Sequence, residues 1–221
     1  MWDNQTIIMI VEGTGVTLYM TLVSTLIAYL LGLPMGIILV VTAPGGLKPN
    51  KIIYKILDMI VNIVRSIPFL ILLMLIIPFT RLIVGKSYGA TATIVPLALA
   101  AAPFVARLVE SSLLEVDHGV IEAAQSMGAS LFTIIRKVLL AEARISLIVG
   151  ATIALGTILG YSAMAGVVGG GGLGDIAIRY GYYRYQGDIM IVTVVLLVAL
   201  VQILQMIGTK LSKKLDRRIT G

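Results

Sequence analysis

Three consecutive residues, Gly85, Lys86 and Ser87, match the end of the phosphate-binding pattern GxxxxGK[ST], in which a glycine-rich backbone cradles the phosphates of a nucleotide. The first glycine of that pattern would fall at position 80, where this chain has Thr80. No apolar strand precedes the match, and the segment leaves no room for a nucleotide-binding fold. The match therefore does not predict ATP binding, and we expect any energy source to reside in another subunit.

Other patterns that could support catalysis are equally weak. Gly169, Gly171 and Gly174 satisfy GxGxxG formally, but they lack the strand–turn–helix context that gives the pattern its meaning. The chain has no cysteine and a single histidine, His118, so the sequence predicts no disulfide, no thiolate site and no histidine metal cluster. No paired carboxylates and no nucleophile beside a base occur in or near an apolar segment. We therefore expect no catalytic residues, no metal and no cofactor.

The composition indicates an integral membrane protein. Of the 221 residues, 58% are hydrophobic and only 13% are charged, which is far from the balance of a soluble domain. The net charge of +6 could suggest a nucleic-acid partner, but the basic residues gather in particular loops, which indicates membrane topology instead. We expect the bilayer to be a partner and expect no nucleic acid.

Five apolar segments predict an all-α, polytopic membrane protein that forms one transmembrane domain over residues 1–221. Each segment is at least as long as the roughly 20 residues needed to cross a bilayer. Gly32 and Gly36 in the first segment favour close helix packing, and Pro68 and Pro78 should bend or end the second. Arg65 would cost about 2.5–3.5 kcal/mol at mid-membrane, so we expect it toward the cytoplasmic end or inside the bundle. The predicted spans are approximately 14–41, 59–80, 87–106, 145–164 and 189–209.

The distribution of Lys and Arg predicts the orientation. With the N-terminus outside and the C-terminus in the cytoplasm, the inner loops and tail hold 12 basic residues and the outer segments hold 4, while the reverse orientation inverts the bias. The N-terminal segment has no basic residue and carries Asp3 and Glu12, so it does not read as a cleaved signal peptide. This orientation places the polar segment 107–142 in the cytoplasm.

Residues 107–142 predict two short helices joined at an angle. Asp117 can cap the first helix, Gly128 suits the left-handed residue that ends it, and Ser130 can cap the second. Leu131 and Ile135 belong to an apolar stripe at helical spacing, with charged residues beside it. Two interpretations are open: an amphipathic segment that lies at the headgroups, or a knob that docks in a groove of a cytoplasmic partner.

A family resemblance favours the docking knob. Glu122, Ala123, Ala124 and Gly128, followed by Val138, Leu139 and Leu140, resemble the EAA loop of permeases in binding-protein-dependent ABC importers. In that family the loop is a coupling helix that sits in a groove of the ATPase. The family pattern usually ends in proline, and this chain has Ala141, so the helix break there should be less sharp. The resemblance implies that the following residues couple to the ATPase: Glu122, Ala123, Ala124, Met127, Gly128, Leu131 and Ile135.

Two further stretches resemble the methionine branch of this family. They are RSIPFLILLMLIIPFTRLIVGKSYG, from Arg65, and YSAMAG with the following GGGGLG, from Tyr161. The glycine-rich stretch is either a turn with a re-entrant or interfacial piece and an aromatic belt, or a place where backbone approaches a translocation path. In the second case the residues that line the gate are Gly160, Tyr161, Ser162 and Met164.

The resemblance implies a type I ABC importer permease in the bacterial inner membrane. Its expected partners are a second permease copy, two ATP-binding subunits, an extracytoplasmic substrate-binding lipoprotein and methionine. A permease for another amino acid remains open. So does an ion-coupled transporter, although such proteins usually carry ionisable groups at mid-membrane, and the third, fourth and fifth predicted spans have none.

Overall fold

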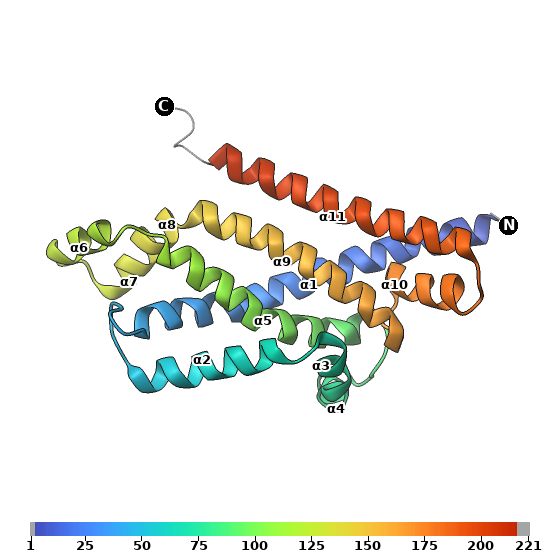
Figure 1. Ribbon diagram of the computed structural model, residues 1–221, viewed down its shortest axis with the longest axis horizontal. Coiled ribbons are helices and arrows are strands. Elements are labelled where there is room, and N and C mark those ends of the chain that lie inside the picture. The colour runs from blue at the N-terminus through green and yellow to red at the C-terminus, as the bar shows by residue number, and fades with distance from the viewer. Residues whose placement is uncertain (1–2, 216–221) are drawn as a thin grey trace.

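The computed structural model describes residues 3–215, and within that range every regular element is helical. The long helices run along the long axis of the molecule, with α6 and α7 at one end and α10 and the N-terminus at the other (Figure 1). Within the described residues, four helices are long and apolar enough to cross a membrane: α1 Asn4–Thr42, α5 Ala90–Leu114, α9 Arg144–Ala165 and α11 Gly187–Leu215. A 3₁₀ turn, η2 (Gly166–Val168), continues α9.

Helix α1 starts well before the predicted position 14. Asp3 caps it by accepting a hydrogen bond from the backbone N–H of Thr6 at 2.8 Å, and its pKa is lowered because the Thr6 hydroxyl and N–H both donate to its carboxylate. The helix runs without a break through Gly13, Gly15 and Gly32, and Pro34 also lies inside it. Helix α5 likewise continues beyond the predicted end at 106 and carries Arg107 and Glu110 within its last turns. The first charged residues after the apolar segment therefore mark where its apolar part ends, while the helix itself continues to Leu114.

The core of the bundle is the contact between α1 and α5. A Cβ atom on Gly32 would lie 2.6 Å from the carbonyl oxygen of Ala102, and one on Gly36 would lie 2.7 Å from that of Ala106. Only glycine allows the two backbones to approach so closely. The packing role predicted for Gly32 and Gly36 is confirmed.

The predicted second span, 59–80, is not one continuous helix. Helix α2 (Lys51–Ser66) begins earlier, capped by Asn50, and a bend of 105° separates it from α3 (Phe69–Leu75). Pro68 causes the break, because it has no N–H to continue the helical ladder and disfavours helical geometry at the preceding residue. A second break at Ile76 leads into α4 (Ile77–Val84). If α2 and α3 together form one broken span, the total is five.

The glycine-rich stretch forms a tight turn and a short helix that packs against the bundle. Gly169, Gly171 and Gly172 have φ of 76°, 84° and 77°, which is the left-handed region. Helix α10 (Gly172–Ile176) and the π-helical η3 (Ala177–Tyr182) follow. The N–H of Leu173 donates to Oγ1 of Thr17 at 2.8 Å and ties α10 to α1. The stretch is thus a turn packed against α1.

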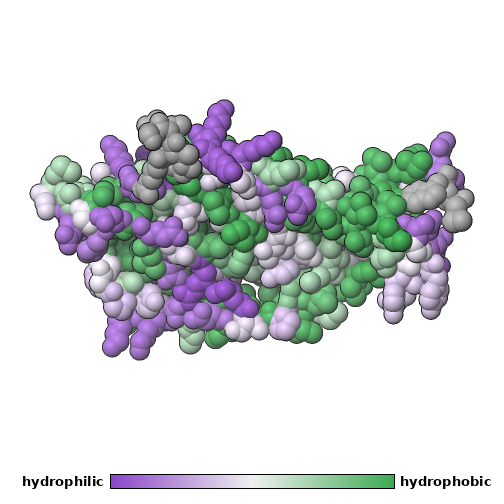
Figure 2. All heavy atoms as spheres, turned by 45° about the horizontal axis from the view of Figure 1, so that its top comes forward, coloured by the Kyte–Doolittle hydropathy of each residue, from purple (hydrophilic) through white to green (hydrophobic). Residues whose placement is uncertain are grey.

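The remaining elements are short and lie together at the end of the molecule opposite α10 (Figure 1). They connect α5 to α9 and carry the segment singled out from the sequence. On the face drawn in Figure 2, hydrophilic side chains gather toward this end, and hydrophobic side chains cover much of the surface between the two ends. These elements are α6 His118–Ser126, α7 Leu131–Thr133, the π-helical η1 Ile134–Leu139 and α8 Leu140–Glu142.

Candidate functional site

Helix α6 begins and ends as the sequence predicted. The Asp117 carboxylate accepts a hydrogen bond from the N–H of Gly119 at 2.8 Å. At the other end Gly128 adopts φ of 75°, and the N–H of Ala129 donates to the carbonyl of Ala124 at 3.1 Å. A left-handed glycine with a hydrogen bond that spans the last turn closes the helix and turns the chain sharply. Both predicted boundary residues are confirmed.

The second helical piece contains a π-helical segment that the sequence did not reveal. Ser130 caps α7 by accepting from the N–H of Thr133 at 3.3 Å, and the next six residues form η1. A π-helical segment inserts an extra residue into the turn, and such segments often occur at functional sites. It places Ile134 and Leu139 against the bundle, while Arg136 and Lys137 stay exposed.

The inner side of α6 is anchored to the bundle. Ala124, which is 5% exposed, belongs to one apolar cluster with Val109 and Leu113 of α5 and with Ile134 and Leu139 of η1. Burial of these side chains fixes the position of α6 relative to the ends of α5 and α9. Because α6 packs chiefly against η1, its movement would reach α5 and α9 through this shared cluster.

The predicted coupling residues separate into an outer and an inner group. Glu122, Ala123, Met127, Gly128 and Leu131 are exposed, and Met127 is 81% exposed. Ala124 is buried and Ile135 is partly buried, so these two hold the loop in place rather than face a partner.

One exposed residue was missed by the sequence reasoning. Phe132 lies beside Leu131 and is 69% exposed. Large apolar side chains that remain open to solvent next to charged ones are typical of interaction surfaces. The sequence offered one signal for Phe132: it is an aromatic residue that lies off the apolar stripe and one helical turn from Arg136.

A cleft of about 450 Å³ separates α6 from the turn between α1 and α2. The turn residues Pro44 to Leu47 form one wall, and His118, Glu122 and Gln125 form the other. The Nε2 atom of His118 lies 3.5 Å from a carboxylate oxygen of Glu122. The polar side of α6 therefore faces an open cleft and does not pack against the turn.

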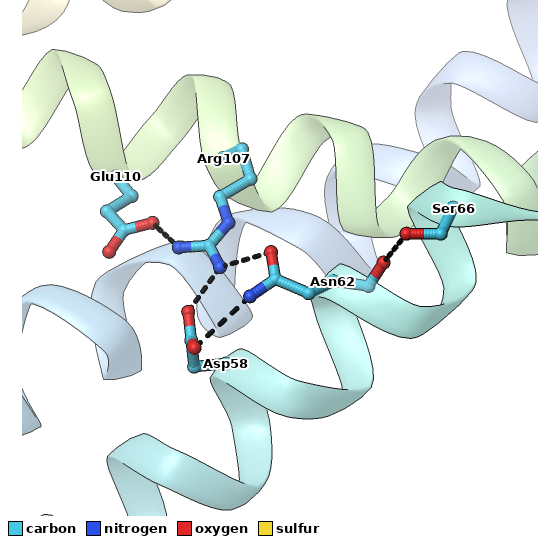
Figure 3. A network of polar contacts seen from close by, with 5 residues as sticks. All are labelled: Asp58, Asn62, Ser66, Arg107 and Glu110. Carbon is cyan, nitrogen blue, oxygen red and sulfur yellow. Dashed lines mark hydrogen bonds and ion pairs between the residues drawn. The ribbon is translucent and has the colours of Figure 1, made fainter.

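A polar network fixes α2 to α5 close to this region (Figure 3). The guanidinium group of Arg107 contacts the Asp58 carboxylate and donates to Glu110 at 2.6 Å and to the side-chain oxygen of Asn62 at 2.8 Å. Asn62 in turn donates to Asp58 at 3.2 Å. One cation thus satisfies two carboxylates that would otherwise be costly at this position. The network joins the broken second span to the helix that leads into α6.

The four predicted gate residues lie on α9 but do not share one face. A helix advances about 100° per residue, so Gly160 and Met164 lie on one side, Tyr161 lies next to them and Ser162 points away. Met164 is 47% exposed, whereas Ser162 is 1% exposed and its hydroxyl donates to the carbonyl of Leu159 at 2.7 Å. Gly160 borders a shallow groove between α9 and α11. The structure groups Gly160, Tyr161 and Met164 on adjacent faces and places Ser162 in the packed interior.

Tyr161 is positioned by the break in the second span. Its ring stacks on that of Phe69, with centroids 4.5 Å apart and planes inclined by 2°. Both rings border a cavity of about 140 Å³ between α2, α3, α5 and α9, and Arg65 lies on its wall. The corner at Pro68 therefore brings a cation and two aromatic rings to one cavity. Arg65 is exposed in the last turn of α2, so it lies outside the packed interior of this chain.

Three known proteins that this chain resembles are each described as part of a methionine transport system. A probable D-methionine transport system permease protein MetI of Vibrio cholerae is 54% identical over 210 residues, which cover 95% of this chain and 93% of the relative. The protein of the same description from Haemophilus influenzae is 46% identical over 209 residues, which cover 95% and 98%. A chain in an inward-facing structure of the MetNI methionine ABC transporter superposes with a TM-score of 0.96 at 49% identity, over 98% of this chain and all of the other.

The family model described as binding-protein-dependent transport system inner membrane component matches residues 32–221. That range includes α6, the gate residues of α9 and the polar network. Together with the identity and coverage of the relatives, it shows that the chain is a multi-pass membrane protein that belongs to the family of binding-protein-dependent transport system inner membrane components.

Proposed function

We propose that this chain is the membrane-spanning permease subunit of an ATP-driven importer for methionine. One observation carries the proposal: α6 stands at one end of the bundle as an anchored helix with an exposed outer face. The similarity to the MetNI chain supports it, because both chains have the same fold over nearly their whole length. A permease of this kind has no catalytic site of its own and depends on a separate ATPase.

The complete importer consists of two copies of this chain, two ATP-binding subunits and an extracytoplasmic substrate-binding protein. A single copy is a small bundle, and α2 and α11 leave many apolar side chains uncovered, which leaves surface for a second copy and for lipid. In this arrangement the N-terminus lies outside the bacterial inner membrane and the C-terminus lies in the cytoplasm. The bias of basic residues toward the inner loops supports that orientation, and it puts α6 within reach of the ATPase.

Coupling follows from the two groups of residues in the loop. Glu122, Ala123, Met127, Gly128 and Leu131 contact the ATPase, in the manner of a helix in a groove. Ala124 and Ile135 hold α6 against α5 and η1. A push on the outer face is thereby passed to α5 and α9, and rocking of these helices switches the path between outward and inward openings.

The translocation path runs along the side of α9 that presents Tyr161 and Met164, with Gly160 at its edge. Polar and aromatic groups on the adjoining α2 and α3 support this assignment, because a side that faced only lipid would be uniformly apolar. Ser162 supports the path from behind by packing inside the bundle. Methionine suits such a path, since thioether and aromatic surfaces pack favourably.

The function is tested by reconstitution of the permease with its ATPase in liposomes that contain ATP, with the binding protein and labelled methionine outside. We expect uptake that requires ATP and persists without an ion gradient. Uptake that follows a proton or sodium gradient and ignores ATP would show an ion-coupled transporter instead.

The coupling role of α6 is tested by Glu122→Lys in the same liposomes. We expect the variant to insert normally but to lose uptake, because the reversed charge lies on the face assigned to the ATPase. Lys86→Glu, a charge reversal at another exposed residue outside this loop, is the matched control and should transport normally. Equal uptake by the two variants would remove α6 from the coupling mechanism.

A further inference from the structure

If α2 and α3 form one broken span, Arg65 lies at its corner as an unpaired cation. It lies in the last turn of α2, about 21 Å along the helix from Lys51 at a rise of 1.5 Å per residue. Among residues 3–215 it makes no ion pair and no side-chain hydrogen bond, whereas the charges of Arg107 and Arg179 are matched by carboxylates. Its charge therefore lacks the compensation that the fold gives to these two arginines.

A charge at this depth requires water or a counter-charge. Ionisable groups inside a membrane are expensive, and they persist where they face a water-filled cavity or bind a ligand. The cavity of about 140 Å³ at the corner between α2 and α3 supplies the aqueous surroundings, since Arg65 lies on its wall. The cavity offers no carboxylate, because Arg65 is the only ionisable lining side chain besides the Tyr161 phenol. An anionic group from outside the chain would complete it.

The rest of the lining is apolar or aromatic. The stacked rings of Phe69 and Tyr161 form one side, and Phe104 and Leu72 extend the apolar surface. A guanidinium group binds a carboxylate through two parallel hydrogen bonds, and aromatic faces pack well against a thioether or aliphatic chain. The end of α2 is closed by local hydrogen bonds, since the carbonyl of Val64 accepts from the N–H of Ile67 at 3.3 Å and that of Asn62 accepts from the Ser66 hydroxyl at 2.8 Å. The cation and the aromatic pair match the carboxylate and the apolar side chain of an α-amino acid.

We propose that the corner between α2 and α3 is a substrate subsite, in which Arg65 binds the carboxylate of the amino acid in transit and the Phe69–Tyr161 pair receives its side chain. The inference rests on the proposed function as an amino-acid importer and adds a binding residue to it. The cavity is smaller than the 300–1,000 Å³ typical of complete ligand sites, so a second copy of the chain completes the enclosure.

The test uses L-photo-methionine, a diazirine analogue of methionine, with the purified permease–ATPase complex in lipid nanodiscs without the binding protein. After irradiation, mass spectrometry locates the labelled residues. We expect label in residues 64–72 or at Tyr161, and competition by unlabelled methionine. In Arg65→Gln this label should fall about tenfold, the factor for loss of one charge-assisted contact.

Two controls separate binding from folding. Arg65→Lys keeps the cation and should retain most of the label, and Arg81→Gln removes an exposed arginine of α4 outside the cavity and should label like the wild type. Size-exclusion chromatography verifies that each variant still assembles with the ATPase. Label located elsewhere, or label at the corner that is unchanged in Arg65→Gln, overturns the subsite.

ATP-driven methionine uptake, measured for the wild type and the Arg65 variants, separates failure of the subsite from failure of the proposed importer function. If the wild type imports methionine and Arg65→Gln imports it equally well, the subsite is wrong and the proposed function stands. If the wild type does not import methionine, the proposed function itself fails. Uptake that is lost in Arg65→Gln and largely kept in Arg65→Lys supports the subsite.

Discussion

The contact between α1 and α5 gives the sharpest prediction, because its geometry sets the cost of a single added methyl group. In Gly36→Ala the new Cβ atom would lie 2.7 Å from both the carbonyl oxygen of Ala106 and the Cβ atom of Val109. Ordinary contact begins at 3.4 Å, so these atoms must separate by 0.7 Å (3.4 minus 2.7). Neither neighbour can rotate away, since one is backbone and the other is attached directly to it.

The free-energy cost of moving these atoms apart can be estimated. Insertion of an extra methyl group into a tightly packed core typically costs about 1–3 kcal/mol. Alanine is a better helix former than glycine by about 1 kcal/mol, which would mask part of the loss. Gly15→Ala is therefore the matched control: Gly15 lies in the same helix and has no atom within 4 Å of the added Cβ. The difference between the two variants isolates the packing cost.

The assay is thermal stability of the purified complex, read as the fraction that remains monodisperse on size-exclusion chromatography after heating. A cost of 1 kcal/mol shifts Tm by about 2–4 °C for a domain of this size. We expect Gly36→Ala to melt between about 2 and 12 °C below Gly15→Ala. Indistinguishable melting of the two variants would refute the close approach of α1 and α5.

Three further predictions concern the network and the coupling loop. Arg107→Met leaves the carboxylates of Asp58 and Glu110 without their cation, so we expect a loss of stability on the order of 1–3 kcal/mol in the same heating assay, partly restored by adding Asp58→Asn. Gly128→Val places a β-branched residue at φ of 75°, where strain costs about 1–2 kcal/mol; size-exclusion chromatography should show weaker ATPase assembly, with Gly128→Asn less affected. Phe132→Ser removes an exposed ring, so we expect unchanged melting but faster dissociation of the ATPase on a biosensor surface.

Local features of the fold were readable from the sequence because local interactions determine them. Asp117, Gly128 and Ser130 mark the ends of α6 and the start of α7, and each acts through neighbouring backbone groups. The pair Gly32 and Gly36 predicted a tight contact, since the spacing alone brings both to one helix face. Glu122 lies exposed on α6 as expected, whereas Met127, which was expected within the helix, is the exposed residue just after its end.

Features that depend on distant pairing could not be predicted. Nothing in the sequence pairs Arg107 with Asp58, which lies 49 residues away, and so the continuation of α5 through its charged residues was missed. Pro68 predicted a bend or an end of the second span, but neither the angle of 105° nor the stacking of Phe69 on Tyr161 could be derived from local sequence. Ser162 was predicted to line the path together with the adjacent residues of the motif. Its actual burial depends on how α9 is rotated about its axis, which the motif does not specify.

Helix α11 depends on its surroundings more than any other long helix. Of its most apolar 18-residue window only 11% is buried, against 67% for α5. Its inner side packs closely on α9, where a Cβ atom on Gly208 would lie 1.9 Å from Oγ1 of Thr152, so it is the uncovered outer side that lipid or a second copy must cover. Detergents that strip annular lipid will therefore loosen this helix first, and the choice of solubilising agent will decide whether the purified chain keeps its native shape.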